Sequence, residues 1–331
     1  MRSTPLAVVI PSWNCADDLG ACVESVSAQT AADVELLVVD NGSADGTLPF
    51  LSRERIPHVA LPRNLGFSAA VNLGVSRTTS PLVMVLNADT VLEPDCLELL
   101  GRAIADDPTL GGVQPRILQL QRGARRHRDD PSAVVYSLGQ ALTADGRGQE
   151  KGAGSHQGAI PRRRREIFGV CGAACLLRRE LLTALGGYEE RYFSFYEDVD
   201  LNVRARVAGW RFCLEPAAVV WHVGHAAWSG GFRRPDAENA RLVARNRLAT
   251  QIKFMPARTI PRIALVELGS LFRAATAGRL FPTLAGKLAA LRWLPDLLRE
   301  RRQLRRTGEL RRARLWLGSR SYYPDYGPPE R

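Results

Sequence analysis

Short apolar runs alternate with helix-type periodicity over the first hundred residues, and this alternation restricts the possible fold more than any other feature. Residues 6–10 and 82–86 are continuous apolar runs, and residues 34–39 are apolar apart from Glu35, as in parallel strands that are covered on both faces. Between the first two runs, apolar residues recur at the spacing of an amphipathic helix, namely Leu19, Cys22, Val23 and Val26. This order predicts an α/β fold with a mostly parallel open sheet, helices on both faces and ligands at the carboxyl ends of the strands.

A different pattern covers residues 119–166, which contain two arginine clusters, many glycines and little periodicity outside a short run at Ala133–Leu138. We interpret most of this segment as a mobile, solvated excursion from the sheet. Order returns with a strand-like run over residues 167–178 and a helix over 198–208. Two further strands are expected at 211–214 and 219–223.

Positive charge is concentrated in the last part of the sequence. The chain has a formal net charge of +11, and residues 258–331 hold 16 Lys and Arg against 6 Asp and Glu. Leucine and arginine are interleaved there with helical spacing, which divides the chain into a main domain of residues 1–257 and a basic amphipathic helical extension of residues 258–331. The asymmetry indicates an anionic partner, either phospholipid or nucleic acid. A helical cap with a solvated, arginine-rich face is the alternative.

We expect neither a secretory signal nor a membrane-spanning helix. The first apolar run ends at Pro11 and is interpreted as a buried strand. No run approaches the roughly 18 uncharged apolar residues that a spanning helix needs. The six cysteines are scattered without zinc-site spacing, so buried thiols in a reducing cytosol are expected.

Polar residues that can bind ligands follow the predicted strands. Asp40 can accept a hydrogen bond from a base or a ribose hydroxyl, although Asp is also an ordinary turn residue. Asn87 and Asp89 offer two oxygen ligands on one side of an extended segment, which suits Mg²⁺ or Mn²⁺ on a diphosphate; the same residues also make a good loop. His222 can add a neutral imidazole to such a site, although a lone His after an apolar strand is often structural.

An acidic run opens the helix expected at residue 198. Glu197, Asp198 and Asp200 place three carboxyl groups within four positions, and the helix dipole offsets part of their repulsion. The aromatic residues just before them indicate a partly desolvated wall, where a carboxylate can serve as a general base. A plain acidic first turn is the alternative.

Six segments, in this order, resemble the family-2 glycosyltransferases with the GT-A fold, and in particular their rhamnosyltransferase-like branch. They are VVIPSWN (8–14), VVDNGSADGT (38–47), RNLGFSAAVNLG (63–74), LNADT (86–90), GAACLLRREL (172–181) and GGYEERYFSFYEDVDLNVRARVAGW (186–210). The resemblance covers about residues 6–250, and the basic extension lies outside it.

The resemblance implies a nucleotide-diphospho-sugar site. The residues that it places around the nucleotide sugar are Pro11, Ser12, Asn14, Asp40, Asn41, Arg63, Asn64, Gly66, Phe67, Asn72 and Asn87. It assigns Asp89 to a divalent metal, Mg²⁺ or Mn²⁺, with Asn87 where the family's D-x-D motif has its first acid. His222 stands 24 residues beyond Asp198, where related sugar-polymerising enzymes have a metal-binding His.

The resemblance also implies a mechanism and a cellular setting. Asp198 matches the family's catalytic base, with Glu197 and Asp200 supporting it or holding acceptor hydroxyls. The expected reaction is a single displacement that inverts the sugar, from dTDP-rhamnose or a UDP-sugar to a glycan or polyprenyl-linked acceptor in cell-wall or cell-surface polysaccharide synthesis. The enzyme is expected in the cytoplasm, held peripherally on the anionic inner face of the plasma membrane by its extension.

Three other function classes fit less well. No specific nucleic-acid-binding motif accompanies the basic extension. A catalytically inactive sugar-nucleotide-binding module would not need the intact acidic run of residues 197–200. A nucleotidyltransferase would need a glycine-rich, basic phosphate loop near the first strand, which residues 11–14 do not supply.

Overall fold

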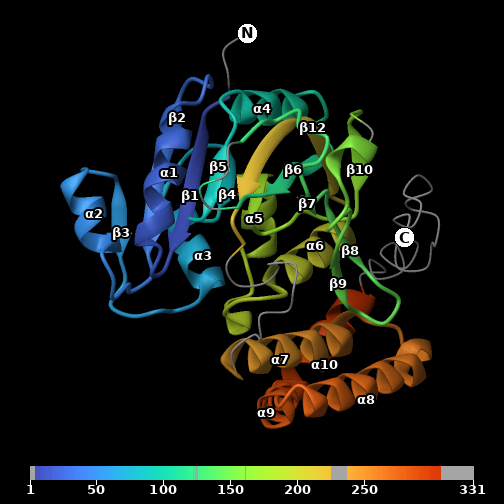
Figure 1. Ribbon diagram of the computed structural model, residues 1–331. Coiled ribbons are helices and arrows are strands. Elements are labelled where there is room, and N and C mark those ends of the chain that lie inside the picture. Colours follow the sequence, from blue (N-terminus) through green and yellow to red (C-terminus); the bar gives the residue numbers. More distant parts are fainter. Residues whose placement is uncertain (1–3, 122, 124–125, 161, 225–236, 307–331) are drawn as a thin grey trace.

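A mixed β-sheet forms the centre of this α/β protein (Figure 1). The computed structural model describes residues 4–121, 123, 126–160, 162–224 and 237–306. The main path of the sheet has the order β10-β12-β6-β11-β4-β1-β2-β3, with β5 beside β12 and β7 beside β6. The strands are β1 Leu6–Ser12, β2 Val34–Asp40, β3 His58–Ala60, β4 Leu82–Leu86, β5 Thr90–Leu92, β6 Leu110–Gln119, β7 Val135–Ser137, β10 Arg165–Ile167, β11 Ala174–Arg178 and β12 Arg211–His222. The α/β class and the open sheet are thus as predicted.

The first half of the sheet is parallel and the second half is mixed. Strand β1 pairs in parallel with β2 and with β4, and β2 pairs in parallel with β3. Strand β11 then runs antiparallel to both β4 and β6. Strands β6 and β12 run parallel to each other, whereas β5, β7 and β10 run antiparallel to their partners. The sheet is therefore less parallel than predicted.

Helices cover both faces of the sheet, which explains the continuous apolar strands. Helices α1 (Ala16–Ser27), α2 (Thr47–Arg53) and α4 (Cys96–Ala105) share one core with Val8 of β1. The neighbouring side chain, Val9, points into the other core, with α3 (Phe67–Arg77), α5 (Arg179–Leu185) and α6 (Glu197–Val207). Successive side chains of a strand point to opposite faces. A strand that is buried on both faces therefore shows no alternation of apolar and polar residues.

The segment 119–166 departs from our prediction. Within its described residues it contributes β7 to the sheet, and it forms a hairpin of β8 (Gln140–Leu142) and β9 (Gly148–Glu150) followed by a short 3₁₀ helix, Gln157–Ala159. Val135 and Leu138 are fully buried. The expectation of a solvated excursion is wrong for these residues, because three-residue strands are too short to show a hydrophobic period.

Two other strand predictions also need correction. In the run 167–178 only residues 174–178 form a strand, β11, while Ile167 is the last residue of β10 and residues 168–173 join the two strands. The strands predicted at 211–214 and 219–223 are one strand, β12, whose register against β6 shifts between Glu215 and Val219. Such an irregularity kinks a strand without ending it.

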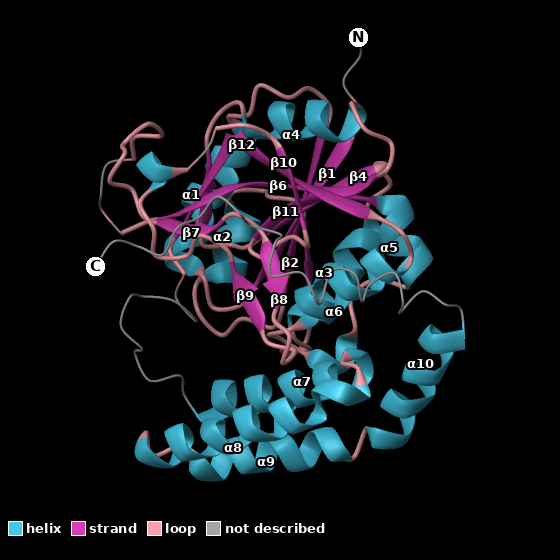
Figure 2. Cartoon of the chain, turned by 90° about the vertical axis from the view of Figure 1, so that its right-hand side faces the viewer, coloured by secondary structure: helices cyan, strands magenta, loops and turns pink. Residues whose placement is uncertain are grey.

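Four helices after residue 236 form a layer beside the α/β unit (Figure 2). They are α7 (Ala237–Phe254), α8 (Ile260–Thr276), α9 (Leu280–Leu291) and α10 (Leu294–Arg306), with a 3₁₀ turn at Ala257–Thr259. Helix α7, which we had assigned to the main domain, packs against α9 and α10. The rest of the predicted extension, residues 307–331, lies outside the described residues. Among the described helices none has the length and apolar character to cross a membrane.

Two glycines of this helical layer predict opposite responses to alanine. A Cβ at Gly286 of α9 would overlap the carbonyl oxygen of Arg241 in α7, whereas at Gly269 of α8 the nearest atom is a terminal nitrogen of Arg273, 3.6 Å away. Gly269→Ala should stabilise the protein by about 1 kcal/mol through helix propensity. Gly286→Ala should destabilise it by about 1–3 kcal/mol, because α9 must move away from α7. Thermal unfolding of both variants checks the pair, and equal shifts would contradict this packing.

Candidate functional site

The carboxyl ends of β1 and β2 hold two polar atoms without a protein partner. Ser12 and Asp40 face each other in the ladder, and each is only 1% exposed. The hydroxyl oxygen of Ser12 and one carboxylate oxygen of Asp40 have no hydrogen-bond partner in the part of the chain that the structure describes. Buried polar atoms are normally paired, so this end of the sheet is suited to a ligand that brings hydrogen-bonding groups.

Three asparagines predicted around the nucleotide use their amides to hold neighbouring loops. Asn41 donates to Asn64 Oδ1 and Gly66 O, at 2.9 and 3.0 Å, and accepts from the N–H of Leu65. Asn14 accepts from the N–H of Ala44, 2.8 Å away. These contacts bring residues 12–14, 40–44 and 64–66 together as one corner, so Asn14, Asn41 and Asn64 shape the site while their amide groups are engaged by the protein.

The remaining predicted nucleotide residues are arranged around this corner. Asn72 binds the backbone N–H and C=O of Tyr188, which ties α3 to the loop before α6. The ring of Phe67 packs edge-on against Tyr188. Pro11 is half-buried beside Ser12, and Arg63 is exposed. At Gly66, whose φ is +92°, a Cβ would overlap the backbone of Phe193, so only glycine allows this close approach.

Asp89 and His222 meet next to this corner, as predicted. The pairing of β5 with β12 sets His222 opposite Thr90. His222 Nε2 then lies 3.0 Å from Asp89 Oδ1 and 3.4 Å from Asn87 Nδ2. Two ligand atoms at right angles around a Mg²⁺ or Mn²⁺ ion lie about 3.0 Å apart, so the carboxylate–imidazole pair fits a divalent cation. A cavity of about 360 Å³ adjoins Asp89 and is also lined by Asp17, Asp18 and Arg126.

Asp198 stands in the first turn of α6 with its carboxylate held on several sides. Oδ2 accepts hydrogen bonds from Gly172 N at 3.0 Å and from Gln140 Nε2 at 2.8 Å, and Oδ1 accepts from Val199 N at 2.7 Å. Burial raises the pKa of Asp198 above its ordinary value, and these three donors oppose the shift. A fixed carboxylate of raised pKa is a suitable general base.

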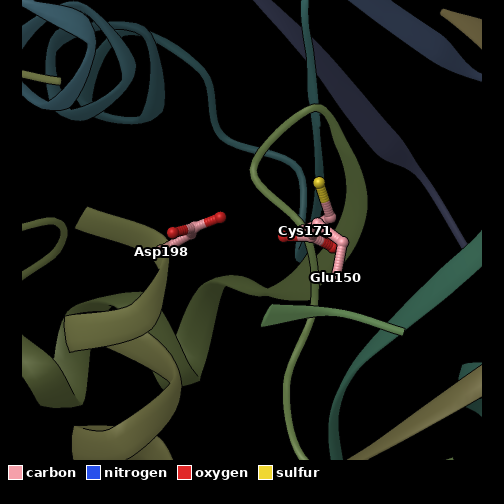
Figure 3. A group of neighbouring side chains, drawn as sticks. All are labelled: Glu150, Cys171 and Asp198. Carbon is pink, nitrogen blue, oxygen red and sulfur yellow. The ribbon is translucent and has the colours of Figure 1, made fainter. Parts of the chain in front are cut away.

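A second carboxyl group, Glu150 of β9, lies in front of Asp198 and was not predicted (Figure 3). Ligand atoms of Glu150, Cys171 and Asp198 lie within 4.8 Å of one another. Glu150 accepts from Ser137 Oγ at 2.5 Å and from Gln140 Nε2 at 3.1 Å. Burial, and next the Asp198 carboxylate, raise the pKa of Glu150 to about 7. A three-residue strand in a glycine-rich segment gives no sequence signal that could have identified this residue.

Glu197 and Asp200 differ from each other and from Asp198. Glu197 is buried, and burial followed by the charge of Asp198 raises its pKa to about 8. Asp200 is fully buried and binds Lys253 Nζ through one oxygen at 2.8 Å and Arg204 Nε through the other at 2.5 Å. Burial works against ionisation of Asp200, yet the two cations lower its pKa. Both oxygens of Asp200 are thus engaged, one by Lys253 of α7 and the other by Arg204 of α6 itself. Our prediction that Asp200 holds acceptor hydroxyls is therefore wrong, and its support of the base stays a prediction.

Comparisons with known proteins identify the family of the chain. The family model described as "Glycosyl transferase family 2" matches residues 7–186. The N-acetylglucosaminyl-diphospho-decaprenol L-rhamnosyltransferase of Mycobacterium tuberculosis is 29% identical over 257 residues, which are 68% of this chain and 78% of that protein.

Two solved structures have a similar fold. GalNAc-T7 with UDP, GalNAc and Mn²⁺ gives a TM-score of 0.56 at 17% identity, over 73% of this chain and 48% of that one. The mannosyltransferase PcManGT from Pyrobaculum calidifontis with GDP-Man and Mn²⁺ gives 0.50 at 19% identity, over 96% of this chain and 87% of that one. At these identities the likeness concerns the fold, which is the predicted GT-A glycosyltransferase fold.

The raised pKa of Glu150 predicts how one substitution changes stability with pH. Between its ordinary value of 4.5 and about 7, the folded protein holds this proton more tightly than the unfolded chain does, so the group's contribution to stability declines as pH rises. Glu150→Gln removes that decline. The variant's stability relative to the parent should increase from pH 4.5 to pH 7.5, as measured by urea unfolding at several pH values. A pH-independent difference would contradict the raised pKa.

Proposed function

This chain belongs to glycosyl transferase family 2, and we propose that it is a metal-dependent, inverting glycosyltransferase. One observation carries the proposal. Among the described residues, buried polar atoms without a partner at Ser12 and Asp40 occur together with the Asp89–His222 pair and the fixed carboxylate of Asp198. These are the parts that a transfer from a nucleotide sugar requires.

The corner formed by β1 and β2 binds the nucleotide in this proposal. The free oxygen of Asp40 accepts a hydrogen bond from the base or ribose, and the Ser12 hydroxyl supplies a second contact. The relative from Mycobacterium tuberculosis, named as an L-rhamnosyltransferase on a decaprenol diphosphate, supports dTDP-rhamnose as the sugar donor and a glycan or polyprenyl-linked acceptor in cell-wall or cell-surface polysaccharide synthesis. A UDP-sugar is the alternative donor.

Asp89 and His222 hold the divalent cation, Mg²⁺ or Mn²⁺, in this proposal. When bound, such an ion neutralises charge on the diphosphate leaving group. In the structure His222 Nε2 contacts the Asp89 carboxylate, so the two ligand atoms already lie side by side. Asn87, 3.4 Å from the same nitrogen, supplies a neutral third group where the family's motif usually has an acid.

Asp198 removes the proton of the acceptor hydroxyl. As that oxygen forms a bond to the anomeric carbon, the bond from this carbon to the diphosphate oxygen breaks, and the proton stays on the carboxyl group. Attack opposite the leaving group inverts the anomeric configuration. Gly172 and Gln140 hold the Asp198 carboxylate in place during the transfer, and a positioned base of this kind contributes about 10²–10⁴-fold to the rate.

A thermal-shift screen tests the class of ligand. Purified protein is heated with dTDP-, UDP- and GDP-sugars, each with Mn²⁺ and with EDTA. A ligand that binds only the folded state raises the unfolding temperature. We expect a metal-dependent shift with a dTDP- or UDP-sugar. The absence of any shift would contradict the proposal.

Replacing the base should separate binding from turnover. Asp198→Asn keeps the size of the side chain and its contact with Gly172 N, but it cannot take a proton. We expect transfer to fall by about 10²–10⁴-fold while the nucleotide-induced thermal shift persists. Near-normal turnover in this variant would refute the base assignment, and Asp40→Asn, which should weaken the thermal shift, is the matched control.

The helical layer also supports peripheral attachment to the inner face of the plasma membrane. Apolar side chains on α8 and α9 recur at helical spacing and are widely exposed, for example Leu265 (71%), Phe272 (71%) and Phe281 (83%). Arginines and one lysine flank them on the same helices. Apolar residues next to cations are the composition of helices that lie on anionic bilayers, where a lipid-linked acceptor would be presented.

A triple substitution tests this attachment. Leu265→Ser, Phe272→Ser and Phe281→Ser together remove three exposed side chains whose burial stabilises an assembly by about 1.5–3 kcal/mol each. Binding to vesicles containing phosphatidylglycerol should fall by at least roughly 10²-fold in a sedimentation assay, and the nucleotide-induced thermal shift should be unchanged. Unaltered vesicle binding would contradict the attachment, and vesicles of phosphatidylcholine alone are the control for charge.

A further inference from the structure

The turn immediately before α6 has unfavourable backbone dihedral angles. Phe193, Phe195 and Tyr196 have φ angles of +66°, +68° and +69°, and they are three of the six non-glycine residues with positive φ in the described chain. Side chains other than glycine are strained in this region. Such a turn persists only where its surroundings hold it in place.

One side chain of α7 contacts this turn at three points. Asn246 is fully buried, and its Nδ2 lies 2.8, 2.8 and 2.7 Å from the carbonyl oxygens of Tyr192, Ser194 and Phe195. The Asn246 Oδ1 accepts from Arg245 Nε at 2.9 Å, which fixes the amide with its nitrogen toward the turn. Carbonyl oxygens that approach one another repel. The amide N–H groups of Asn246 offset this repulsion, because they donate to all three oxygens.

The turn connects the two halves of the site. The N–H of Ser68, at the start of α3, donates to Phe193 O at 3.3 Å, and Gly66 lies against the same residue. At its other end the carbonyl of Tyr196 accepts from Asp200 N at 2.9 Å, in the first turn of α6. A change in the turn would therefore move Asp198 relative to the nucleotide corner.

We propose that Asn246 is a positioning residue of the transfer reaction, which holds the turn in the conformation, with positive φ at Phe193, Phe195 and Tyr196, that aims Asp198. The inference rests on the proposed function only for its kinetic consequence. The conformational consequence concerns the backbone of the turn and can be measured without a substrate.

Two substitutions of Asn246 in the full chain test the proposal. Asn246→Asp preserves size but places a carboxylate against three carbonyl oxygens, and Asn246→Ser removes the amide. Both should lower kcat by roughly 10²-fold, the cost of a small misplacement of reacting groups, while the dissociation constant of the free nucleoside diphosphate stays within about twofold. The matched control is Glu267→Gln, which breaks the ion pairs of Glu267 with Arg247 and Lys287 in the same helical layer without touching the turn.

A second-site substitution distinguishes positioning from general loss of structure. Glycine adopts positive φ without strain, so Phe195→Gly in the Asn246→Ser background should restore at least part of kcat, and no such gain is expected from Phe195→Ala. Hydrogen exchange of the amides of residues 194–197 should accelerate in Asn246→Ser and remain unchanged in Glu267→Gln.

The outcomes are separable. Normal kcat in Asn246→Asp, or an equal loss in Glu267→Gln, would overturn the positioning role. If the parent protein transfers no sugar from any nucleotide sugar, the proposed function fails, and unchanged hydrogen exchange in Asn246→Ser would then still overturn the inference on its own.

Discussion

The first turn of α6 buries three carboxyl groups, and much of the surrounding structure offsets the free-energy cost of removing their charges from water. Asp198 also faces Glu150 within 4.8 Å. Two unit charges at that distance repel by about 3.5 kcal/mol at an effective dielectric constant of about 20. The dipole of a helix N-terminus supplies about 0.3–2 kcal/mol, which is too little. The charge of one carboxyl group is therefore balanced by cations, and other carboxyl groups keep their protons and stay neutral.

The buried acids differ in how their charge is balanced, and this difference explains their different roles. Asp200 is ionised between Arg204 and Lys253, and it is fully enclosed. Glu197 and Glu150 keep a proton to higher pH than an exposed glutamate does, with pKa values raised by burial to about 8 and about 7. Asp198 is left as the carboxylate whose charge is stabilised by donors that do not neutralise it. One acidic motif thus contains a structural ion pair, a neutral acid and a candidate base.

The sequence predicts this architecture where local pattern and burial agree, and it fails where the decisive contacts are distant. Strands such as Leu82–Leu86 have continuous apolar character because both faces are covered, so the open sheet could be anticipated from the pattern, and the meeting of Asp89 with His222 could be anticipated from the family resemblance. Glu150 could not, since its approach to Asp198 depends on a hairpin of three-residue strands. Asp200 resembles its neighbours in sequence, and only Lys253, 53 residues away, distinguishes it.

The helical layer is joined to the site more closely than a division at residue 257 implies. Lys253 of α7 binds Asp200 and also Glu300 of α10, and Arg191, in the loop before the turn, binds Glu300 as well. Tyr192 stacks on Trp293 and shares a hydrogen bond with Thr250. These contacts surround the turn that leads into Asp198.

The family model matches residues 7–186, and Asp198, His222 and α7 all follow this range. The matched part contains the nucleotide corner and Asp89. On the proposed mechanism the later part supplies the base, the second metal-binding side chain and the support for the turn. On the same proposal, the range that the family model covers binds the nucleotide, and the range after it sets the base against the acceptor. If the acceptor hydroxyl lies between Asp198 and the anomeric carbon, as the proposed mechanism requires, the hairpin of β8 and β9 would lie beside the acceptor, because Gln140 and Glu150 of this hairpin adjoin the Asp198 carboxylate.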